Sequence, residues 1–229
     1  MSIFAIGDLH LSGAVNKPMN VFGSHWDNHW EKIQKNWKDN VKEDDAVLIP
    51  GDISWAMTLE EAIVDLKEIH LLPGKKFFVK GNHDYWWKGI TKLNQIFKDQ
   101  FFLQNNFYVY EDYILCGTRG WLCPNLIKFT DHDQKIYERE LKRLTLSLEQ
   151  VQNIKGKELI VMTHYPPTND QLEPSGFTEL YERYGVSKVI YGHLHGEHIF
   201  SMGLQGNHNG VNYYLVSADY MDFKLRFIL

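Results

Sequence analysis

Short runs of apolar residues recur along the chain, and each run ends abruptly in a polar residue. The runs cover residues 2–6, 46–50, 76–80, 159–163 and 188–191 and are rich in Ile, Val, Leu and Phe. Nearly continuous apolar runs of this length are typical of strands that are buried on both faces of a sheet. We therefore predict five buried strands at these positions.

Between the strands, apolar residues recur at helical spacing. Residues 26–40 and about 134–153 each place such residues on one face, which predicts two amphipathic helices. A third helix is predicted from residues 58–61, because Thr-Leu-Glu-Glu at these positions is a capping box. Its inner face would carry Ile63, Leu66 and Ile69. Strands and helices in alternation predict an α/β fold with parallel strand pairing.

Two segments break this alternation. Residues 108–117 are predicted to form an antiparallel hairpin, and residues 213–217 with 224–228 are predicted to form a closing β-meander without a helix. Because this strand content exceeds that of one doubly wound sheet, we expect a second, more antiparallel sheet packed on the first. No internal repeat or Pro/Ser-rich linker divides the chain, so we interpret residues 1–229 as one domain.

Each of the five predicted strands leads into an Asp, Asn or His residue. In open α/β sheets, ligands bind beyond the carboxyl ends of the parallel strands, where the loops diverge. Each such residue alone has an ordinary explanation as an N-cap, a turn former or a hydrogen-bonded histidine. Separate explanations of this kind do not account well for polar residues at all five strand ends, and we interpret these residues as one site. Its residues are Asp8, His10, Asp52, Asn82, His164, His193 and His195.

The donor types at these strand ends predict a metal centre. Asp8 and His10 are two residues apart, as are His193 and His195, so each pair can point to the same side of an extended segment. Carboxylate, amide and imidazole groups together suit Mn, Fe or Zn, whereas an all-oxygen set would favour Mg or Ca. The absence of thiolate ligands argues against a structural zinc site. The ligands are too many for one ion and fit two divalent metal ions.

Composition and charge narrow the choice of partners. The chain is 44% hydrophobic and 23% charged, as is typical of folded globular proteins, and its formal net charge is −5. Without a basic excess, extended nucleic acid is not expected as a partner. No apolar run approaches the roughly 20 residues that span a bilayer, and the first residues do not resemble a signal peptide. Two cysteines, Cys116 and Cys123, lack zinc-ligand spacing and suit a reducing compartment. We therefore expect a cytoplasmic protein without a membrane partner.

The strand-end residues lie within short motifs that resemble those of a known family. In order along the chain, these are Gly7-Asp8-Leu9-His10, Gly51-Asp52, Gly81-Asn82-His83-Asp84, His164 and Gly192-His193-Leu194-His195. The ordered set resembles the five motifs of the calcineurin-like metallophosphoesterase superfamily and extends over most of the chain. The resemblance implies two packed mixed β-sheets flanked by helices, in a four-layer α/β/β/α sandwich.

The resemblance also implies how the ligands would divide between two metal ions. The first ion would be bound by Asp8, His10 and His195. The second ion would be bound by Asn82, His164 and His193. Asp52 would bridge both ions, which a carboxylate can do with its two oxygens.

The implied reaction is the hydrolysis of a phosphodiester or phosphomonoester in a small phosphorylated substrate. Two ions would hold the phosphoryl group and lower the pKa of a bridging water, and the resulting hydroxide would attack phosphorus. His83 would contact the phosphate and act as the general acid that protonates the leaving group. Asp84 would hold the His83 ring and raise its pKa.

Two other functions stay open on sequence grounds. A nuclease is one, because DNA-repair relatives share this motif set, although the net charge of −5 argues against it. A non-catalytic metal-binding interaction scaffold is the other. The complete ligand set, together with His83 and Asp84, argues against the scaffold, because a non-catalytic protein does not need a positioned general acid.

Several further residues carry weaker signals. Arg119 would either reach a substrate phosphate or form a surface ion pair. His25 and His29 have the helical spacing of a metal pair, but no third ligand is evident and we interpret them as packed in a helix. His132 is interpreted as part of a helix cap. A group of aromatic residues would either form a wall for an apolar substrate group or pack loops onto the core. These residues are Trp55, Tyr85, Trp86, Trp87 and Trp121.

Overall fold

The computed structural model describes all 229 residues and contains two mixed β-sheets. The strands of the first sheet are β1 (Ile3–Ala5), β2 (Ala46–Pro50), β3 (Lys75–Val79), β4 (Gln100–Leu103) and β11 (Arg226–Phe227). Their order across the sheet is β11-β1-β2-β3-β4. Strands β1 to β4 run parallel, whereas β11 pairs antiparallel with β1.

The second sheet is parallel in its centre and antiparallel at both edges. Its strands are β5 (Phe107–Tyr110), β6 (Tyr113–Thr118), β7 (Glu158–Thr163), β8 (Lys188–Tyr191), β9 (Gly206–His208) and β10 (Val211–Leu215). Their order is β5-β6-β7-β8-β10-β9, and only β5 and β9 are antiparallel to their neighbours. All five strands predicted from the apolar runs are therefore present, three in the first sheet and two in the second.

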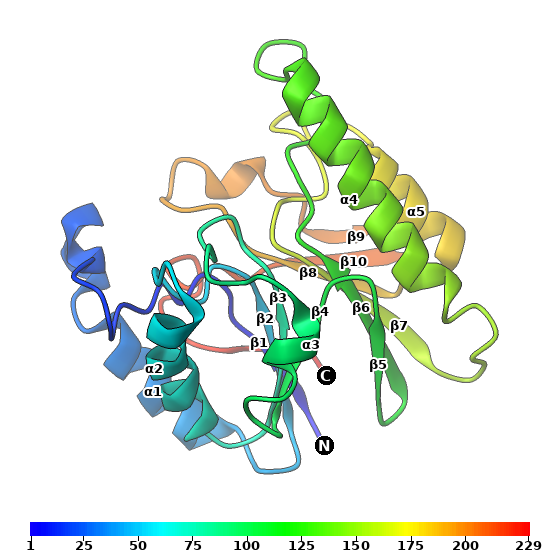
Figure 1. Ribbon diagram of the computed structural model, residues 1–229. Coiled ribbons are helices and arrows are strands. Elements are labelled where there is room, and N and C mark those ends of the chain that lie inside the picture. The colour runs from blue at the N-terminus through cyan, green and yellow to red at the C-terminus, as the bar shows by residue number, and fades with distance from the viewer.

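Helices cover the outer face of each sheet. They are α1 (His29–Asn40), α2 (Leu59–His70), α3 (Ile90–Leu93), α4 (Asp131–Glu149) and α5 (Gly176–Tyr184), with short 3-10 turns η1 (Met19–Phe22), η2 (Ser24–Trp26) and η3 (Phe200–Met202). α1 and α2 lie on the first sheet, and α4 and α5 lie on the second (Figure 1). Three clusters of buried apolar side chains fill the space between the sheets and the two spaces under the helices. The fold is the expected four-layer sandwich.

The predicted helices form with shifted boundaries. α1 begins at His29 rather than at residue 26, because Trp26 lies in a separate 3-10 turn and Asn28 adopts a left-handed conformation before the helix. α4 begins earlier than predicted, at Asp131, because Thr130 caps its first turn. None of the helices is both long enough and apolar enough to cross a membrane.

The inner face of α2 differs from the prediction at one residue. The Ile63 side chain is 36% exposed, whereas Ala62, Leu66 and Ile69 are fully buried. Residues at spacings of three and four lie on one stripe of a helix, and Ala62 rather than Ile63 continues the stripe of Leu66 and Ile69. The predicted capping box is confirmed, because Thr58 accepts a hydrogen bond from the backbone N–H of Glu61 and the Glu61 side chain accepts from that of Thr58.

Thr58→Ala is expected to lower the free energy of unfolding by about 1 kcal/mol, because it leaves an N-terminal N–H of α2 without its acceptor. Urea denaturation followed by circular dichroism measures the change. Thr58→Ser keeps the hydroxyl and is the matched control. Equal losses in the two variants would contradict a capping role for the hydroxyl.

The last strands of the chain do not form the predicted β-meander. The predicted hairpin of residues 108–117 is confirmed as β5 and β6. β10, however, pairs in parallel with β8, and the chain then crosses to the first sheet, where β11 pairs with β1. β10 buries Val211, Tyr213 and Leu215 in the core under α5, so it belongs to the second sheet rather than to a local hairpin with β11. The crossing segment between them passes the carboxyl ends of the central strands.

Candidate metal centre

Seven strand-end residues converge where the loops leave the carboxyl ends of the central strands of both sheets. Asp8 and His10 follow β1, Asp52 follows β2 and Asn82 follows β3, all in the first sheet. The second sheet contributes His164 after β7, and His193 and His195 after β8. Side chains from five strands of the two sheets therefore face one another at one edge.

The backbone at these positions is strained in a way that local sequence does not favour. Asp8, His10, Asp52 and His193 all have positive φ angles, of 57°, 46°, 50° and 74°. Non-glycine residues rarely adopt this region, and when they do the surrounding structure must hold them there, as is common at functional sites. The close approach also explains Gly81, because a Cβ atom there would overlap the Asp52 carboxylate. The tertiary structure therefore holds these residues in strained backbone conformations that direct their side chains into the site.

One group of possible ligand atoms comes from Asp8, His10 and His195. His195 Nε2 lies 3.4 Å from Asp8 Oδ1 and 3.3 Å from His10 Nε2. The other ring nitrogen of His195, Nδ1, donates a hydrogen bond to Asp219 Oδ1 at 2.9 Å. A carboxylate that accepts from the far nitrogen of an imidazole fixes the orientation of the ring and leaves Nε2 free for an ion.

A second group comes from Asp8, Asp52 and His164. His164 Nε2 lies 3.5 Å from Asp52 Oδ2 and 2.7 Å from Asn82 Oδ1, and His193 Nδ1 lies 3.1 Å from it. His164 Nδ1 donates to the backbone carbonyl of Pro50 at 3.0 Å, which again directs Nε2 toward the site. Asn82 and His193 therefore stand beside this group, where the sequence predicts them.

Asp52 belongs to the second group and also faces the first. Its Oδ2 atom is 3.8 Å from His10 Nε2 and 3.5 Å from His164 Nε2, so one oxygen faces a histidine of each group. Its Oδ1 atom accepts a hydrogen bond from the backbone N–H of His83 at 2.8 Å, which fixes the rotation of the carboxylate. Asp52 is therefore within reach of histidines from both groups.

Burial and neighbouring charges shift the pKa values of the site residues strongly. Burial, followed by the charge of Asp8, raises the pKa of Asp52 to about 8. Burial is the largest influence and opposes ionisation of Asp8, but the charge and hydrogen bond of His195, with the charges of His164 and His10, together hold the pKa of Asp8 below its usual value. Burial also opposes the charge on His195, yet Asp8 and then Asp219 raise its pKa to about 10. Burial lowers the pKa of His193 to about 3, so this ring is neutral and can be a ligand.

The residues present fit divalent metal ions. Two buried carboxylates side by side cannot both ionise easily unless positive charge lies between them. The surrounding donors are imidazoles and an amide oxygen, a set that suits borderline ions such as Mn, Fe or Zn. Divalent ions would therefore supply the charge that Asp8 and Asp52 lack when they are both deprotonated.

Asp84 does not hold the His83 ring, and this part of the sequence prediction is wrong. The Asp84 side chain is fully buried, and its Oδ1 atom accepts hydrogen bonds from the backbone N–H groups of Ile53 and Ser54 and from Trp86 Nε1, at 2.9, 3.2 and 3.2 Å. Its Oδ2 atom accepts from the Gly81 N–H at 2.7 Å. These hydrogen bonds use both oxygens of the Asp84 carboxylate. Asp84 therefore connects the loop after β2 to the loop after β3.

The His83 ring instead packs among aromatic side chains at the edge of the site. Its centroid lies 4.4 Å from that of Trp55 and 5.8 Å from that of His10. Burial, followed by the charge of His164, lowers the pKa of His83 rather than raising it as predicted. His83 thus remains half-buried beside the ligands, as a candidate for contact with substrate.

Asp219 is the functional residue that the sequence patterns did not reveal. It lies just after β10 and accepts hydrogen bonds from His195 Nδ1 and from the backbone N–H of Gly196, both at 2.9 Å. β10 is a further parallel strand whose carboxyl end reaches the same edge. The strand-end pattern would have identified Asp219 if residues 213–217 had been interpreted as parallel rather than as part of a meander.

The aromatic residues divide between the two roles that the sequence leaves open. Trp86 and Trp87 are buried in the core, and the Trp121 indole donates to Asp133. Trp55 stacks on His10, with ring centroids 4.8 Å apart, and borders a cavity of about 390 Å³. Trp26, which the sequence places only in a helix core, also borders that cavity. Tyr85 is 49% exposed and lines neither this cavity nor the core.

The remaining histidines do not form additional metal groups with one another. His29 contacts the carbonyl oxygen of Leu9 through Nε2 at 3.0 Å, which supports the packing interpretation. His25 lines the cavity beside Trp55 rather than pairing with His29. His132 is exposed within the first turn of α4, where Thr130 and Asp133 form the cap.

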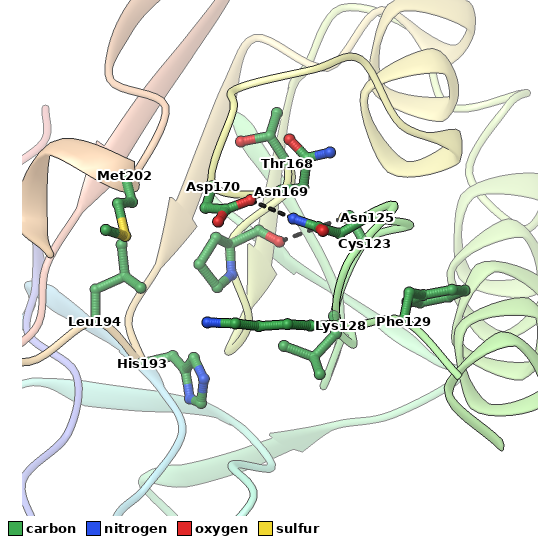
Figure 2. A pocket seen from close by; sticks show the side chains of 12 residues that line it. Cys123, Asn125, Lys128, Phe129, Thr168, Asn169, Asp170, His193, Leu194 and Met202 are labelled. Atoms are coloured by element: carbon green, nitrogen blue, oxygen red, sulfur yellow. Dashed lines mark hydrogen bonds between the residues drawn. The ribbon is translucent and has the colours of Figure 1, made fainter. Parts of the chain in front are cut away.

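A second pocket, of about 240 Å³, opens on the other side of the metal centre beside His193. Its exposed lining is mostly apolar. Figure 2 shows His193 and Leu194 on one side and Asn125 and Asp170, joined by a hydrogen bond, on the other. The Lys128 side chain extends across the space between them (Figure 2).

Comparisons with known proteins agree with this fold and site. A family model described as calcineurin-like phosphoesterase matches residues 1–197. The chain therefore belongs to the calcineurin-like phosphoesterase family. No curated protein matches the chain.

Two solved structures share the fold. One is a protein of unknown function, AQ665, from Aquifex aeolicus, with 16% identity and a TM-score of 0.51 over 99% of this chain and 95% of that one. The other is TT1561 of Thermus thermophilus, with 15% identity and a TM-score of 0.56 over 99% of this chain and 97% of that one. At these identities the likeness concerns the fold alone.

Proposed function

We propose that this protein is a dinuclear metal-dependent phosphoesterase that hydrolyses a phosphodiester or phosphomonoester. The observation that carries the proposal is the position of Asp52, whose Oδ2 atom faces His10 at 3.8 Å and His164 at 3.5 Å. With the remaining ligands on either side, the site offers two adjacent sets of donors that share a carboxylate. Mn, Fe or Zn would suit these donors.

When bound, two divalent ions would neutralise charge on the phosphoryl group and activate a water molecule at neutral pH. The protein's own residues would keep the donors in fixed positions, which phosphoryl transfer mainly requires. Asp219 orients His195, and the Pro50 carbonyl orients His164. The backbone of His83 holds Asp52 in its bridging position.

The pocket beside His193 would hold the organic part of the ester. It adjoins a ligand of the metal centre, and its exposed lining is largely apolar, with Asn125, Asn169 and Asp170 at one side. Apolar walls with a few polar groups are typical of small-molecule sites. We therefore favour a small ester with an organic group over a bare inorganic substrate.

His83→Ala is expected to leave the metal content intact but to lower turnover by about 10²–10⁴-fold for substrates with poor leaving groups, the range of general acid catalysis. Aryl phosphates with leaving groups of graded pKa measure this effect. His132→Ala removes an exposed histidine on α4 and is the control. Equal loss for all leaving groups would exclude proton donation by His83.

The proposal as a whole is tested by a matrix of metals and substrates. Bis-p-nitrophenyl phosphate, phosphomonoesters, cyclic nucleotides and dinucleoside polyphosphates are each combined with Mn²⁺, Fe²⁺ or Zn²⁺. We expect turnover that needs added metal and is lost with a chelator. A single-stranded oligonucleotide in the same matrix tests the nuclease alternative, and absence of turnover with every combination would favour the scaffold.

A further inference from the structure

A third pocket, of about 200 Å³, is lined by an excess of positively charged side chains. It lies at the carboxyl edge of the sheets, because Lys80 follows β3, Arg119 follows β6, and Arg139 and Arg143 project from α4. Lys88 completes its basic lining. We call this cluster of five residues the basic pocket. Its position between the strand ends and α4 places it at the same edge as the metal centre.

Only one carboxylate lines the basic pocket. The Glu140 side chain is fully buried, and its Oε1 atom lies 2.8 Å from Arg143, 3.2 Å from Arg139 and 3.9 Å from Arg119. Its Oε2 atom accepts a hydrogen bond from Thr118 at 2.6 Å. A purely structural ion pair that joins α4 to β6 would need one cation for one carboxylate. The remaining positive charge has no second carboxylate among the residues that line the pocket, where Lys80 donates only to the backbone carbonyl of Trp87, at 3.2 Å.

The excess of positive over negative charge in the basic pocket is clearest at Arg119. Its side chain is 18% exposed, and its guanidinium packs on Trp121, with its carbon 4.5 Å from the ring centroid. Its Nε atom is buried without a hydrogen-bond partner. Burial lowers the pKa of Arg119, and burial together with the charge of Arg119 lowers the pKa of Lys80. Buried N–H donors of this kind are costly unless an acceptor completes them.

The backbone links the basic pocket directly to the metal centre. The carbonyl oxygen of Arg119 accepts hydrogen bonds from the N–H groups of His164 and Tyr165, at 3.0 and 3.1 Å. On the other side, Lys80 is separated from Asn82 only by Gly81. The pocket is therefore a neighbour of the metal ligands but contains none of them.

We propose that the basic pocket binds a phosphate group, either the non-reacting phosphate of a substrate with more than one or free inorganic phosphate. Guanidinium groups present planar pairs of donors that match the oxygens of a phosphate. The five cations and one carboxylate would leave a net positive charge that a phosphate dianion would partly neutralise. The chain as a whole has a formal net charge of −5, so the excess of positive charge in this pocket is opposite to the net charge of the protein.

Inorganic phosphate is the probe for the first test, with binding to the metal-loaded full-length protein measured by isothermal titration calorimetry. We expect two classes of site in the wild type, one at the metal centre and one in the basic pocket. The double variant Lys88→Gln/Arg139→Gln removes the two cations most open to solvent, both outside the ligand set. It should weaken one class by about 10- to 100-fold, the effect of lost charge-assisted hydrogen bonds, and keep the other.

The matched control is Lys135→Gln/Lys142→Gln, which removes the same charge from exposed positions of α4 outside the pocket. It should retain both classes of site. The proposal is overturned if the Lys88/Arg139 variant binds phosphate like the wild type, or if the control loses as much affinity. Circular dichroism of both variants shows that any loss does not come from unfolding.

A kinetic arm distinguishes the two sources of the phosphate and alone rests on the proposed function. Nucleoside mono-, di- and triphosphates are compared as substrates of the wild type and the Lys88/Arg139 variant. A higher KM for the di- and triphosphate only identifies a second substrate phosphate. Unchanged kinetic constants with lost phosphate binding identify free phosphate as the ligand. If no substrate turns over, the proposed function fails while the calorimetric result still decides the basic pocket.

Discussion

Asp52→Ala is expected to abolish phosphoester hydrolysis and to lower the metal content of the protein. The variant removes the carboxylate whose Oδ2 atom faces both His10 and His164, so both sets of donors lose the proposed bridging ligand. Loss of a single electrostatic contribution to a phosphoryl transition state costs about 10²–10³-fold in turnover, and loss of an ion costs more. Steady-state kinetics with bis-p-nitrophenyl phosphate and elemental analysis of the purified protein measure both effects.

The control for this variant is Asp222→Ala. Asp222 is 80% exposed and pairs only with Lys224 at the surface, so its removal should change neither metal content nor turnover. Asp52 and Asp222 both have a φ angle of 50°, so the two variants also share the same backbone strain. If Asp52→Ala still bound two ions per chain, the bridging assignment would be wrong, whatever the effect on activity. If it lost metal but kept its activity, the metal-dependent reaction itself would be contradicted.

Asp84→Ala is expected to lower the free energy of unfolding by about 3 kcal/mol or more, because it leaves several buried N–H donors without an acceptor. The carboxylate accepts from the backbone N–H groups of Ile53, Ser54 and Gly81 and from the Trp86 indole. Those groups flank two metal ligands, so both loops should also lose their geometry. Guanidinium chloride denaturation measures the stability, and metal titration measures the site.

Asp84→Asn provides the comparison, because it keeps the shape of the side chain and one acceptor oxygen. Its amide N–H₂ would face a backbone donor, so it should be destabilised, but less than Asp84→Ala. One other result would instead support the role that the family resemblance implies for Asp84, which is to hold the His83 ring. If both variants unfolded like the wild type and lost activity only for poor leaving groups, Asp84 would act through His83 rather than through the loops.

The residues that converge at the candidate metal centre could be predicted from the sequence because two local signals coincide there. Buried strands require continuous apolar runs, and a polar residue at the end of such a run must leave the core. His164, for example, follows five apolar or β-branched residues and lies where β7 ends. Parallel strands then bring such ends to a common edge whatever their distance along the chain.

The residues that orient the ligands could not be predicted in the same way. Asp84 adjoins His83 in the sequence, and the family pattern assigns it to that ring, yet its oxygens accept from N–H groups of a different loop. The sequence does not mark Asp219, because β10 carries an alternating rather than a continuous burial pattern, which suits an antiparallel strand equally well. Hydrogen-bond partners depend on which loops meet, and no local periodicity encodes that.

The sequence by itself determined the five buried strands, the hairpin and three of the helices, which residue types stand at the strand ends, and that those types suit divalent metal ions. Periodicity and donor chemistry are local properties, and they can be read from one chain. Only the tertiary structure decided that one oxygen of Asp52 faces a histidine of each donor group, that Asp219 orients His195, and that three arginines surround Glu140. Each of these three features requires that elements far apart in the sequence pack side by side. The distances, the burial and the charge balance are set only when the two sheets and their helices come together.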